Sequence, residues 1–319
     1  MYFPVAGIEV APWVPFVVGF LVAFFCSMGG VSGANLLLPF QMSFLGFTTP
    51  AVSATNHFFN IVAIPSGVYR FIKEGRMVWP LTWMVIAGTI PGVFLGVFAR
   101  VQYLPDPKNF KFFAGLVLLY IGGMMVKALL KKPEPGSDKK SAERRFQELA
   151  NQFRKSSEAA QQSGKEALPT AEVKKFSIKE MEYTFYGETY SVNPIIIFSL
   201  SALVGVIGGI YGIGGGAIIA PVFVAIFNLP VYTIAGACLM GTFLTSLTAV
   251  LFYQVIAPFY PHLAVAPDWI LGLLFGFGGA VGMYLGARVQ KFVPATIIKW
   301  ILAIVLIFAA SRYVIGFFM

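Results

Sequence analysis

Two glycine-rich segments interrupt apolar stretches of this chain, and both have the residue types of an anion-binding backbone. The first break reads GGVSGAN at positions 29–35, and the second break reads GGIYGIGGG at positions 208–216. Glycine permits a positive φ and lets a ligand approach the main chain closely. An apolar helix that starts directly after such a break presents unbonded N–H groups and the positive end of its dipole. Two such helix ends facing one cavity would bind an anion without a buried lysine or arginine.

We therefore predict an anion site built from the two breaks and from the helices that follow them, expected over 51–69 and 232–257. In both helices polar side chains recur at helical spacing on one face. The predicted substrate-binding residues are Gly30, Ser32, Gly33, Asn35, Thr55, Asn56, Gly212, Gly214, Gly215, Gly216, Thr242, Thr245 and Ser246. Polar groups are costly in hydrocarbon and normally face the interior of a helix bundle. The alternative, for any single residue of the set, is hydrogen bonding or close packing between helices.

Four other polar residues have two interpretations each. His57 and Asn60 continue the polar face of 51–69. They would either take part in proton coupling or line the pathway, or they would be hydrogen-bonded structural residues. Arg100 and Arg288 end equivalent helices. They would be anchors whose charges reach the membrane surface, or they would form a charged mouth that attracts anions.

The composition predicts an all-α integral membrane protein. Of the 319 residues 57% are hydrophobic and 12% charged, whereas soluble domains carry about 25% charged residues. Segment 131–193 alone holds 22 of the 37 charged residues. Apolar runs of about 20 residues elsewhere predict transmembrane helices. Cytoplasmic loops account for the net charge of +9, so we expect no nucleic-acid partner. Metal-ligand spacings and nucleotide-binding motifs are absent from the sequence, so we expect neither a metal nor a cofactor.

Apolar segments recur in the same order in the two halves of the chain. They lie at about 13–28, 34–47, 51–69, 79–99 and 110–130, and again at about 194–208, 216–229, 232–257, 268–288 and 295–318. We interpret this as a duplication, with 1–130 as the first membrane repeat, 131–193 as a charged cytoplasmic insert or linker, and 194–319 as the second repeat. Glycines spaced by four, at Gly88, Gly92 and Gly96 and at Gly278, Gly282 and Gly286, predict close helix packing.

Each repeat would consist of a re-entrant or broken helix hairpin and three transmembrane helices. Lysine and arginine gather in 69–78 and in the insert, which predicts that both are cytoplasmic, that the N-terminus lies outside, and that the repeats are inverted. Hairpins that cross the membrane fully would give the same placement of loops. Within the insert, 138–163 predicts a charged helix and 183–192 a β-hairpin around Gly187.

One motif suggests an enzyme instead. The GVSG string at 30–33 matches the GxSG of rhomboid intramembrane proteases, with His57 as a candidate partner of Ser32. The second break keeps the glycines but has no serine, so both breaks share a backbone shape rather than a nucleophile. We therefore expect that the protein is not an enzyme.

The duplicated breaks, the apolar arms with Pro39 and Pro221, and the glycine-rich third helices resemble the TauE/SafE family of sulfite and organosulfonate exporters. The resemblance implies a multi-pass transporter of the inner membrane that moves sulfite or organosulfonates such as sulfoacetate. Export would be coupled to an ion gradient, for example of protons, by alternating access of the two repeats. The implied partners are the small anion, the lipid bilayer and the coupling ion. The long insert departs from the compact loop expected of the family. An anion channel, a transporter of another small anion, and a membrane scaffold remain alternatives.

Overall fold

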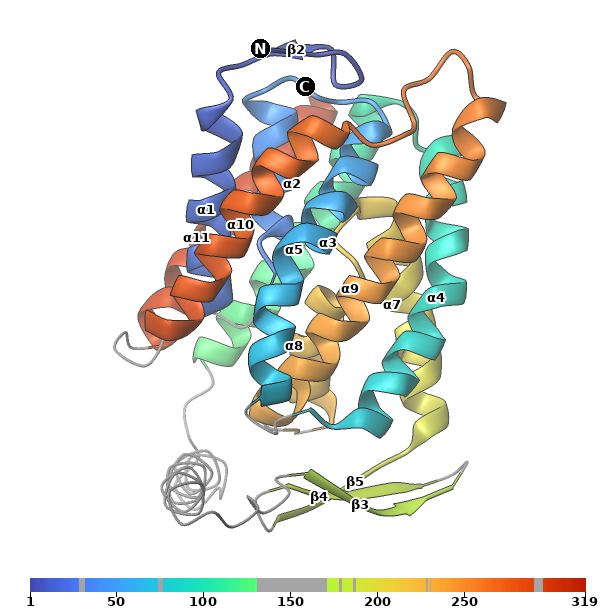
Figure 1. Ribbon diagram of the computed structural model, residues 1–319, viewed down its shortest axis with the longest axis vertical. Helices are drawn as coiled ribbons and strands as arrows, with labels where there is room; N and C mark the ends of the chain where they lie inside the picture. Colours follow the sequence, from blue (N-terminus) through green and yellow to red (C-terminus); the bar gives the residue numbers. More distant parts are fainter. Residues whose placement is uncertain are drawn as a thin grey trace.

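The computed structural model describes residues 1–28, 32–73, 77–130, 171–177, 180–185, 188–227, 229, 231–289 and 295–319, which form a helical bundle with a small β-sheet at one end (Figure 1). The helices of the first half are α1 (Trp13–Met28), α2 (Ala34–Ser43), α3 (Ala51–Lys73), α4 (Trp79–Gln102) and α5 (Pro107–Leu130). Those of the second half are α7 (Pro194–Tyr211), α8 (Gly216–Ile226), α9 (Val231–Ile256), α10 (Trp269–Val289) and α11 (Ala295–Phe318), with a 3-10 turn η1 (Ala257–Phe259). The predicted fold class, a helical membrane protein, is confirmed.

Six helices of the described chain are long and apolar enough to cross a membrane, namely α4, α5, α7, α9, α10 and α11. Helix α3 is also long, at 23 residues, but it carries the predicted polar face in its interior. Ser53, Asn56, His57 and Asn60 on that face are all fully buried. The bundle therefore buries the polar face of α3 and leaves apolar side chains on its outer surface, as expected in a bilayer.

The helices that follow the two breaks are too short to span a membrane. Helix α2 has 10 residues and α8 has 11, which is about 15–17 Å at 1.5 Å per residue, against a hydrocarbon core of about 30 Å. Figure 1 shows α2 and α8 in opposite halves of the bundle. The alternative of fully crossing hairpins is therefore wrong, because each of these arms begins inside the bundle and is too short to cross. Both arms also end earlier than predicted, at Ser43 and Ile226.

The two halves of the chain pack through matched pairs of helices. Helix α1 lies along α10, and in the same way α7 lies along α4. Helix α3 contacts α10, and in the same way α9 contacts α4. Two further pairs join equivalent helices of the two halves, namely α3 with α9 and α5 with α11. The predicted glycine faces lie in two of these pairs: the glycines of α4 face α7, and the glycines of α10 face α1. A Cβ added at Gly92 would lie 2.9 Å from the nitrogen of Val206, and one at Gly282 would lie 2.9 Å from the carbonyl carbon of Phe20. Close packing by these glycines is confirmed, whereas the inverted orientation of the halves stays a prediction.

A three-stranded antiparallel sheet lies at the end of the bundle away from both chain termini (Figure 1). Its strands are β3 (Ala171–Phe176), β4 (Met181–Phe185) and β5 (Glu188–Val192). The pairing of β4 with β5 confirms the predicted hairpin, and β3 is an additional strand. Two short strands, β1 (Tyr2–Phe3) and β2 (Ile8–Glu9), pair near the N-terminus. The helix expected over 138–163 lies outside the described residues.

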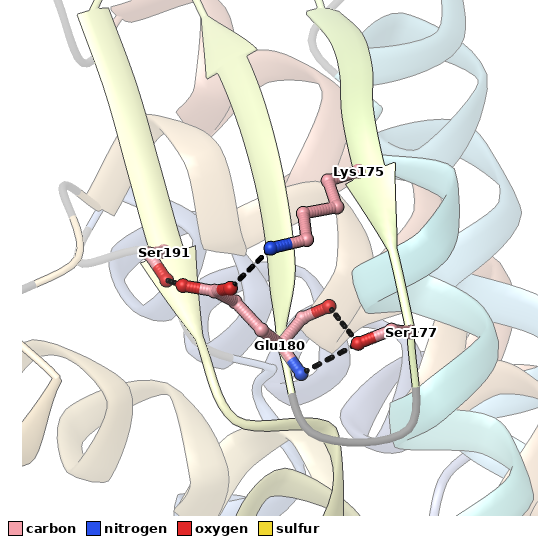
Figure 2. A network of polar contacts seen from close by, with 4 residues as sticks. All are labelled: Lys175, Ser177, Glu180 and Ser191. Carbon is pink, nitrogen blue, oxygen red and sulfur yellow. Dashed lines mark hydrogen bonds and ion pairs between the residues drawn. The ribbon is translucent and has the colours of Figure 1, made fainter.

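An exposed ion pair joins β3 to the start of β4 (Figure 2). The Lys175 ammonium lies 2.7 Å from a Glu180 carboxylate oxygen, and the Ser191 hydroxyl donates to the other oxygen at 3.3 Å. The hydrogen bond from Lys175 lowers the pKa of Glu180 and raises the pKa of Lys175 itself. The Ser177 hydroxyl exchanges hydrogen bonds with the Glu180 backbone at 3.2 Å. These contacts link the end of β3 to the start of β4.

Candidate functional site

The two breaks meet in the interior of the bundle, although they are far apart in the sequence. The Asn56 amide of α3 donates one hydrogen bond to the carbonyl of Ala34, 3.0 Å away, and one to the carbonyl of Gly212, 2.9 Å away. The Tyr211 hydroxyl, in the second break, donates to the carbonyl of Asn35 at 3.2 Å. Asn56 is fully buried. One side chain of α3 thus bridges the start of α2 and the segment that leads into α8.

Both short helices begin without a side-chain cap. Gly33 is the N-cap of α2 and Gly215 that of α8, and neither helix start has a side-chain hydrogen bond. In the second break Gly212 and Gly214 have φ values of 92° and 73°, a region that glycine adopts without strain. The positive ends of two helix dipoles are therefore left without a neutralising side chain inside the bundle. Gly30 lies outside the described residues.

Close packing is a sufficient reason for the glycines of the second break. A Cβ at Gly212 would lie 2.7 Å from the carbonyl oxygen of Ser53, and a Cβ at Gly214 or Gly215 would lie 2.6 Å from the methyl group of a threonine on α9 or α4. Gly216 likewise has the Cys238 carbonyl against it. The second break is thus wedged by its backbone between α3, α4 and α9. Any group that these glycine positions offer to a bound molecule must therefore be a main-chain group.

Polar side chains from α3 and α9 close around the second break. Nδ1 of His57 lies 3.1 Å from the Ser246 hydroxyl, and the Asn60 amide donates to the same hydroxyl at 3.3 Å and to the carbonyl of Ile213 at 3.0 Å. These residues are fully buried. The predicted polar faces of α3 and α9 therefore meet each other beside the break.

Several buried polar atoms around the breaks have no hydrogen-bond partner among the described residues. They are Ser32 Oγ, both side-chain polar atoms of Asn35, Gln41 Oε1, His57 Nε2 and Asn60 Oδ1. Asn35 is 2% exposed, yet neither its amide nitrogen nor its oxygen is bonded. Buried polar groups are almost always hydrogen-bonded in native proteins. A polar ligand or water is therefore expected among these groups.

Some predicted residues lie away from this cluster or make internal bonds. Thr55 accepts a hydrogen bond from the Asp268 backbone at 2.9 Å, at the start of α10. Thr242 donates to the carbonyl of Cys238 at 2.9 Å, one turn earlier in its own helix. Thr245 lies 2.8 Å from the Thr89 hydroxyl. For these three threonines the structural interpretation accounts for the hydroxyl completely.

Arg100 is not a surface anchor. It is fully buried, with Nε 3.3 Å from the Ser53 hydroxyl and the guanidinium 3.7 Å from the centre of the Phe110 ring. An anchor would place its charge in the headgroup region, so that interpretation is wrong for Arg100. The backbone of Arg288 lies in the last turn of α10, and its side chain is outside the described part of the chain.

Three residues of the cluster were not predicted. Gln41 donates to Asn56 at 3.3 Å, Thr89 faces Thr245, and Tyr211 bonds to the first break. Gln41 offered one signal, because it is a polar residue seven positions after Ala34 and so lies on the same face of α2. Thr89 offered none, since threonine hydroxyls in apolar helices usually bond within their own helix. Tyr211 offered none, because nothing in the sequence distinguishes it from a buried aromatic residue that only packs.

Comparison with known proteins identifies related chains. The model of the family described as "Sulfite exporter TauE/SafE" matches residues 15–313. The chain is 28% identical over 125 residues to "Probable membrane transporter protein YdhB" of Bacillus subtilis (strain 168), covering 39% of this chain and 47% of that protein. It is 26% identical over 126 residues to "Probable membrane transporter protein YunE" of the same organism, covering 40% and 43%. The chain thus matches less than half the length of these relatives. No solved structure gives a significant match.

Proposed function

The chain belongs to the TauE/SafE sulfite exporter family, and on that premise we propose that it is a secondary transporter of small sulfur-containing anions. The substrate would be sulfite or an organosulfonate such as sulfoacetate, exported across the inner membrane by alternating access of the two repeats. The gradient of a coupling ion, for example a proton, would drive this export. The observation that carries the proposal is Asn35, a buried amide that has no partner among the described residues and lies at the uncapped start of α2.

The chemistry of the breaks suits an oxyanion. Sulfite and sulfonate groups have several acceptor oxygens and a delocalised negative charge. The Ser32 hydroxyl and the Asn35 amide are donors without an acceptor among the described residues, and they stand at the positive end of a helix dipole. The backbone of Gly215 and Gly216 begins the second helix on the other side of Asn56. Neither break contains an acidic residue, so nothing in them would repel an anion.

The short helices that begin inside the bundle support a transporter with a central site. Discontinuous helices that meet near the middle of the membrane are a common way to build such a site between repeats. His57 remains a candidate for proton coupling, because its Nε2 is buried and unbonded while its Nδ1 faces Ser246. An anion channel would share these features. Concentration of sulfite against its own gradient in proteoliposomes would separate a transporter from a channel.

The sharpest test of the site is the substitution Asn35→Asp. It keeps the shape of the side chain and places a negative charge beside the proposed anion. At about 5 Å and an effective dielectric constant of about 20, two unit charges repel by about 3 kcal/mol, which is roughly a hundredfold loss of affinity. A bulky residue at Gly215 would be a poorer test, because it would report the packing on Thr89.

The assay is uptake of labelled sulfite into proteoliposomes, with Asn109→Asp as the matched control. Asn109 is exposed in the first turn of α5, so the same change of charge there should leave uptake unaltered. Equal unfolding midpoints of the two variants would show that both fold. If Asn35→Asp transported sulfite as well as the control, the site would be wrongly assigned.

The membrane placement is proposed with the function. Six long apolar helices and the family make this a multi-pass membrane protein, and we propose that the N-terminus is outside and the insert 131–193 cytoplasmic. Single cysteines at Tyr2 and Lys175, both exposed, would be labelled by an impermeant maleimide from opposite sides of the membrane. Labelling from the same side would contradict the topology. A scaffold function would require the insert, so uptake that survives its removal would argue against it.

A further inference from the structure

Arg100 is a buried cation for which the described residues provide no acidic partner. It lies in the last turn of α4 with 0% of its surface exposed. Among the residues that the structure describes, no carboxylate lies within ion-pair distance of its guanidinium. The ion pair seen among these residues, between Lys175 and Glu180, lies in the β-sheet. Taking an ion out of water without a counter-charge is costly. A buried arginine therefore needs an explanation beyond helix packing.

The contacts of Arg100 satisfy only part of the guanidinium. Nε donates to the Ser53 hydroxyl at 3.3 Å, one terminal nitrogen donates to the carbonyl of Leu104, and the ring of Phe110 lies under the carbon of the guanidinium. The other terminal nitrogen, Nη2, is buried and has no hydrogen-bond partner in the described part of the chain. A charged guanidinium nitrogen without a partner is a strong donor for an oxyanion, because hydrogen bonds from an ionised donor are stronger than those between neutral groups.

Arg100 is also connected to the second break. The Ser53 hydroxyl, which accepts from Arg100, donates to the carbonyl of Ile210 at 3.1 Å. Ser53 lies one helical turn before Asn56, which holds Gly212. The free edge of Arg100 is thus within a few side chains of the two helix starts, toward the end of the bundle where α4 gives way to α5.

We propose that Arg100 forms a second anion position, in which Nη2 binds one oxygen of a sulfite or sulfonate on its way to or from the central site. The inference rests on the proposed function, because the anion is taken to be the transported one. Arg100 also adds positive charge near the breaks, where the side chains that line the site are neutral. It thus favours anions over neutral solutes of the same size.

A purely structural role makes different predictions. Stacking on Phe110 and bonding to the Leu104 carbonyl at the end of α4 would stabilise the fold whether or not an anion is present. Loss of Arg100 would then lower the unfolding midpoint by the same amount at every anion concentration. Loss of an anion position instead changes the concentration of anion that gives half of the stabilisation.

The experiment measures the unfolding midpoint of the purified full-length protein against sulfite concentration at constant ionic strength. We expect Arg100→Gln to raise the half-saturating concentration of sulfite at least tenfold. Arg312→Gln is the matched control, because Arg312 is exposed on α11, and it should behave as the unchanged protein. If Arg100→Gln does not fold, Arg100→Lys takes its place. It keeps the charge without the fork, and we expect a loss of at least threefold.

Each outcome is decisive. A half-saturating concentration that is unchanged in the folded Arg100 variant overturns the inference, even if the protein transports sulfite. A sulfite-dependent midpoint that needs Arg100, in a protein that shows no uptake into proteoliposomes, supports the anion position and overturns the proposed function. Sulfite without effect on the midpoint of the unchanged protein, together with no uptake, overturns both.

Discussion

Asn56 holds the two breaks together, so its replacement tests whether their meeting is a stable feature of the fold. Its amide makes three hydrogen bonds, to the carbonyls of Ala34 and Gly212 at 3.0 and 2.9 Å and from Gln41 at 3.3 Å. Each hydrogen bond between membrane helices contributes about 0.6 kcal/mol on average and up to about 1.7. The three together are therefore worth about 2 kcal/mol.

Asn56→Ala should cost more than these bonds alone. The carbonyl oxygens that lose a partner are buried, and a buried group left unsatisfied costs about 1–3 kcal/mol. Helical carbonyls retain a backbone partner, so the lower end applies to Ala34. We expect a total loss of about 2–4 kcal/mol in the free energy of unfolding. Asn56→Asp should cost still more, because a carboxylate oxygen would face both carbonyl oxygens.

The assay is equilibrium unfolding in mixed micelles, followed by circular dichroism, with Asn109→Ala as the control. The control removes the same amide from an exposed position, so its free energy of unfolding should change by less than about 0.5 kcal/mol. A change in Asn56→Ala as small as that of the control would refute the reasoning. The bridge would then be a contact of little energy, and the two breaks would be held together by other groups.

Two other predictions concern packing and charge. Replacing Gly92 or Gly282 with alanine should lower the free energy of unfolding by about 1–3 kcal/mol, because the new methyl group would meet the backbone of a neighbouring helix. Gly123→Ala is the control, because the added methyl group there has open space, and it should be neutral. The pKa of Glu180 is lowered from 4.5 and that of Lys175 is raised from 10.5. Their mutual stabilisation is therefore present between these values, is lost as the pH falls through the lowered pKa of Glu180, and is lost as the pH rises through the raised pKa of Lys175. Glu180→Gln and the unchanged protein should thus differ in thermal midpoint at pH 7, and the difference should disappear once the pH is below the lowered pKa of Glu180. A difference that does not shrink as the pH falls below 4.5 would contradict the assignment.

Features that depend on spacing along the chain could be predicted from the sequence. Glycines at intervals of four residues predicted which faces of α4 and α10 pack closely, and both do so. The hydrophobic pattern placed the long helices, and alternation in 183–192 placed the β4–β5 hairpin. Each of these signals is local, because it depends only on residues within a few turns.

Features that depend on distant neighbours could not be predicted. Arg100 at a helix end is usually an anchor, and only the nearness of Ser53 and Phe110 buries it. Thr55 lies beside Asn56 in the sequence, but helix geometry turns it by about 100° toward α10. The amount of glycine in the second break suggested a binding site, yet the packing of Gly215 on Thr89 explains much of it equally well.

The two breaks share a backbone shape but differ in which positions tolerate other side chains. This difference indicates which break determines the preference for one anion over another. A side chain at Gly214 or Gly215 would collide with α9 or α4, so the glycine positions of the second break can contribute only main-chain groups. The first break carries Ser32 and Asn35, whose side-chain polar atoms are buried and have no partner among the residues that the structure describes. Main-chain N–H groups recognise any anion of suitable size, whereas a side-chain amide can be exchanged for other groups. Substitutions at Asn35 should therefore change which anion is preferred, while substitutions in the second break should change whether the protein folds.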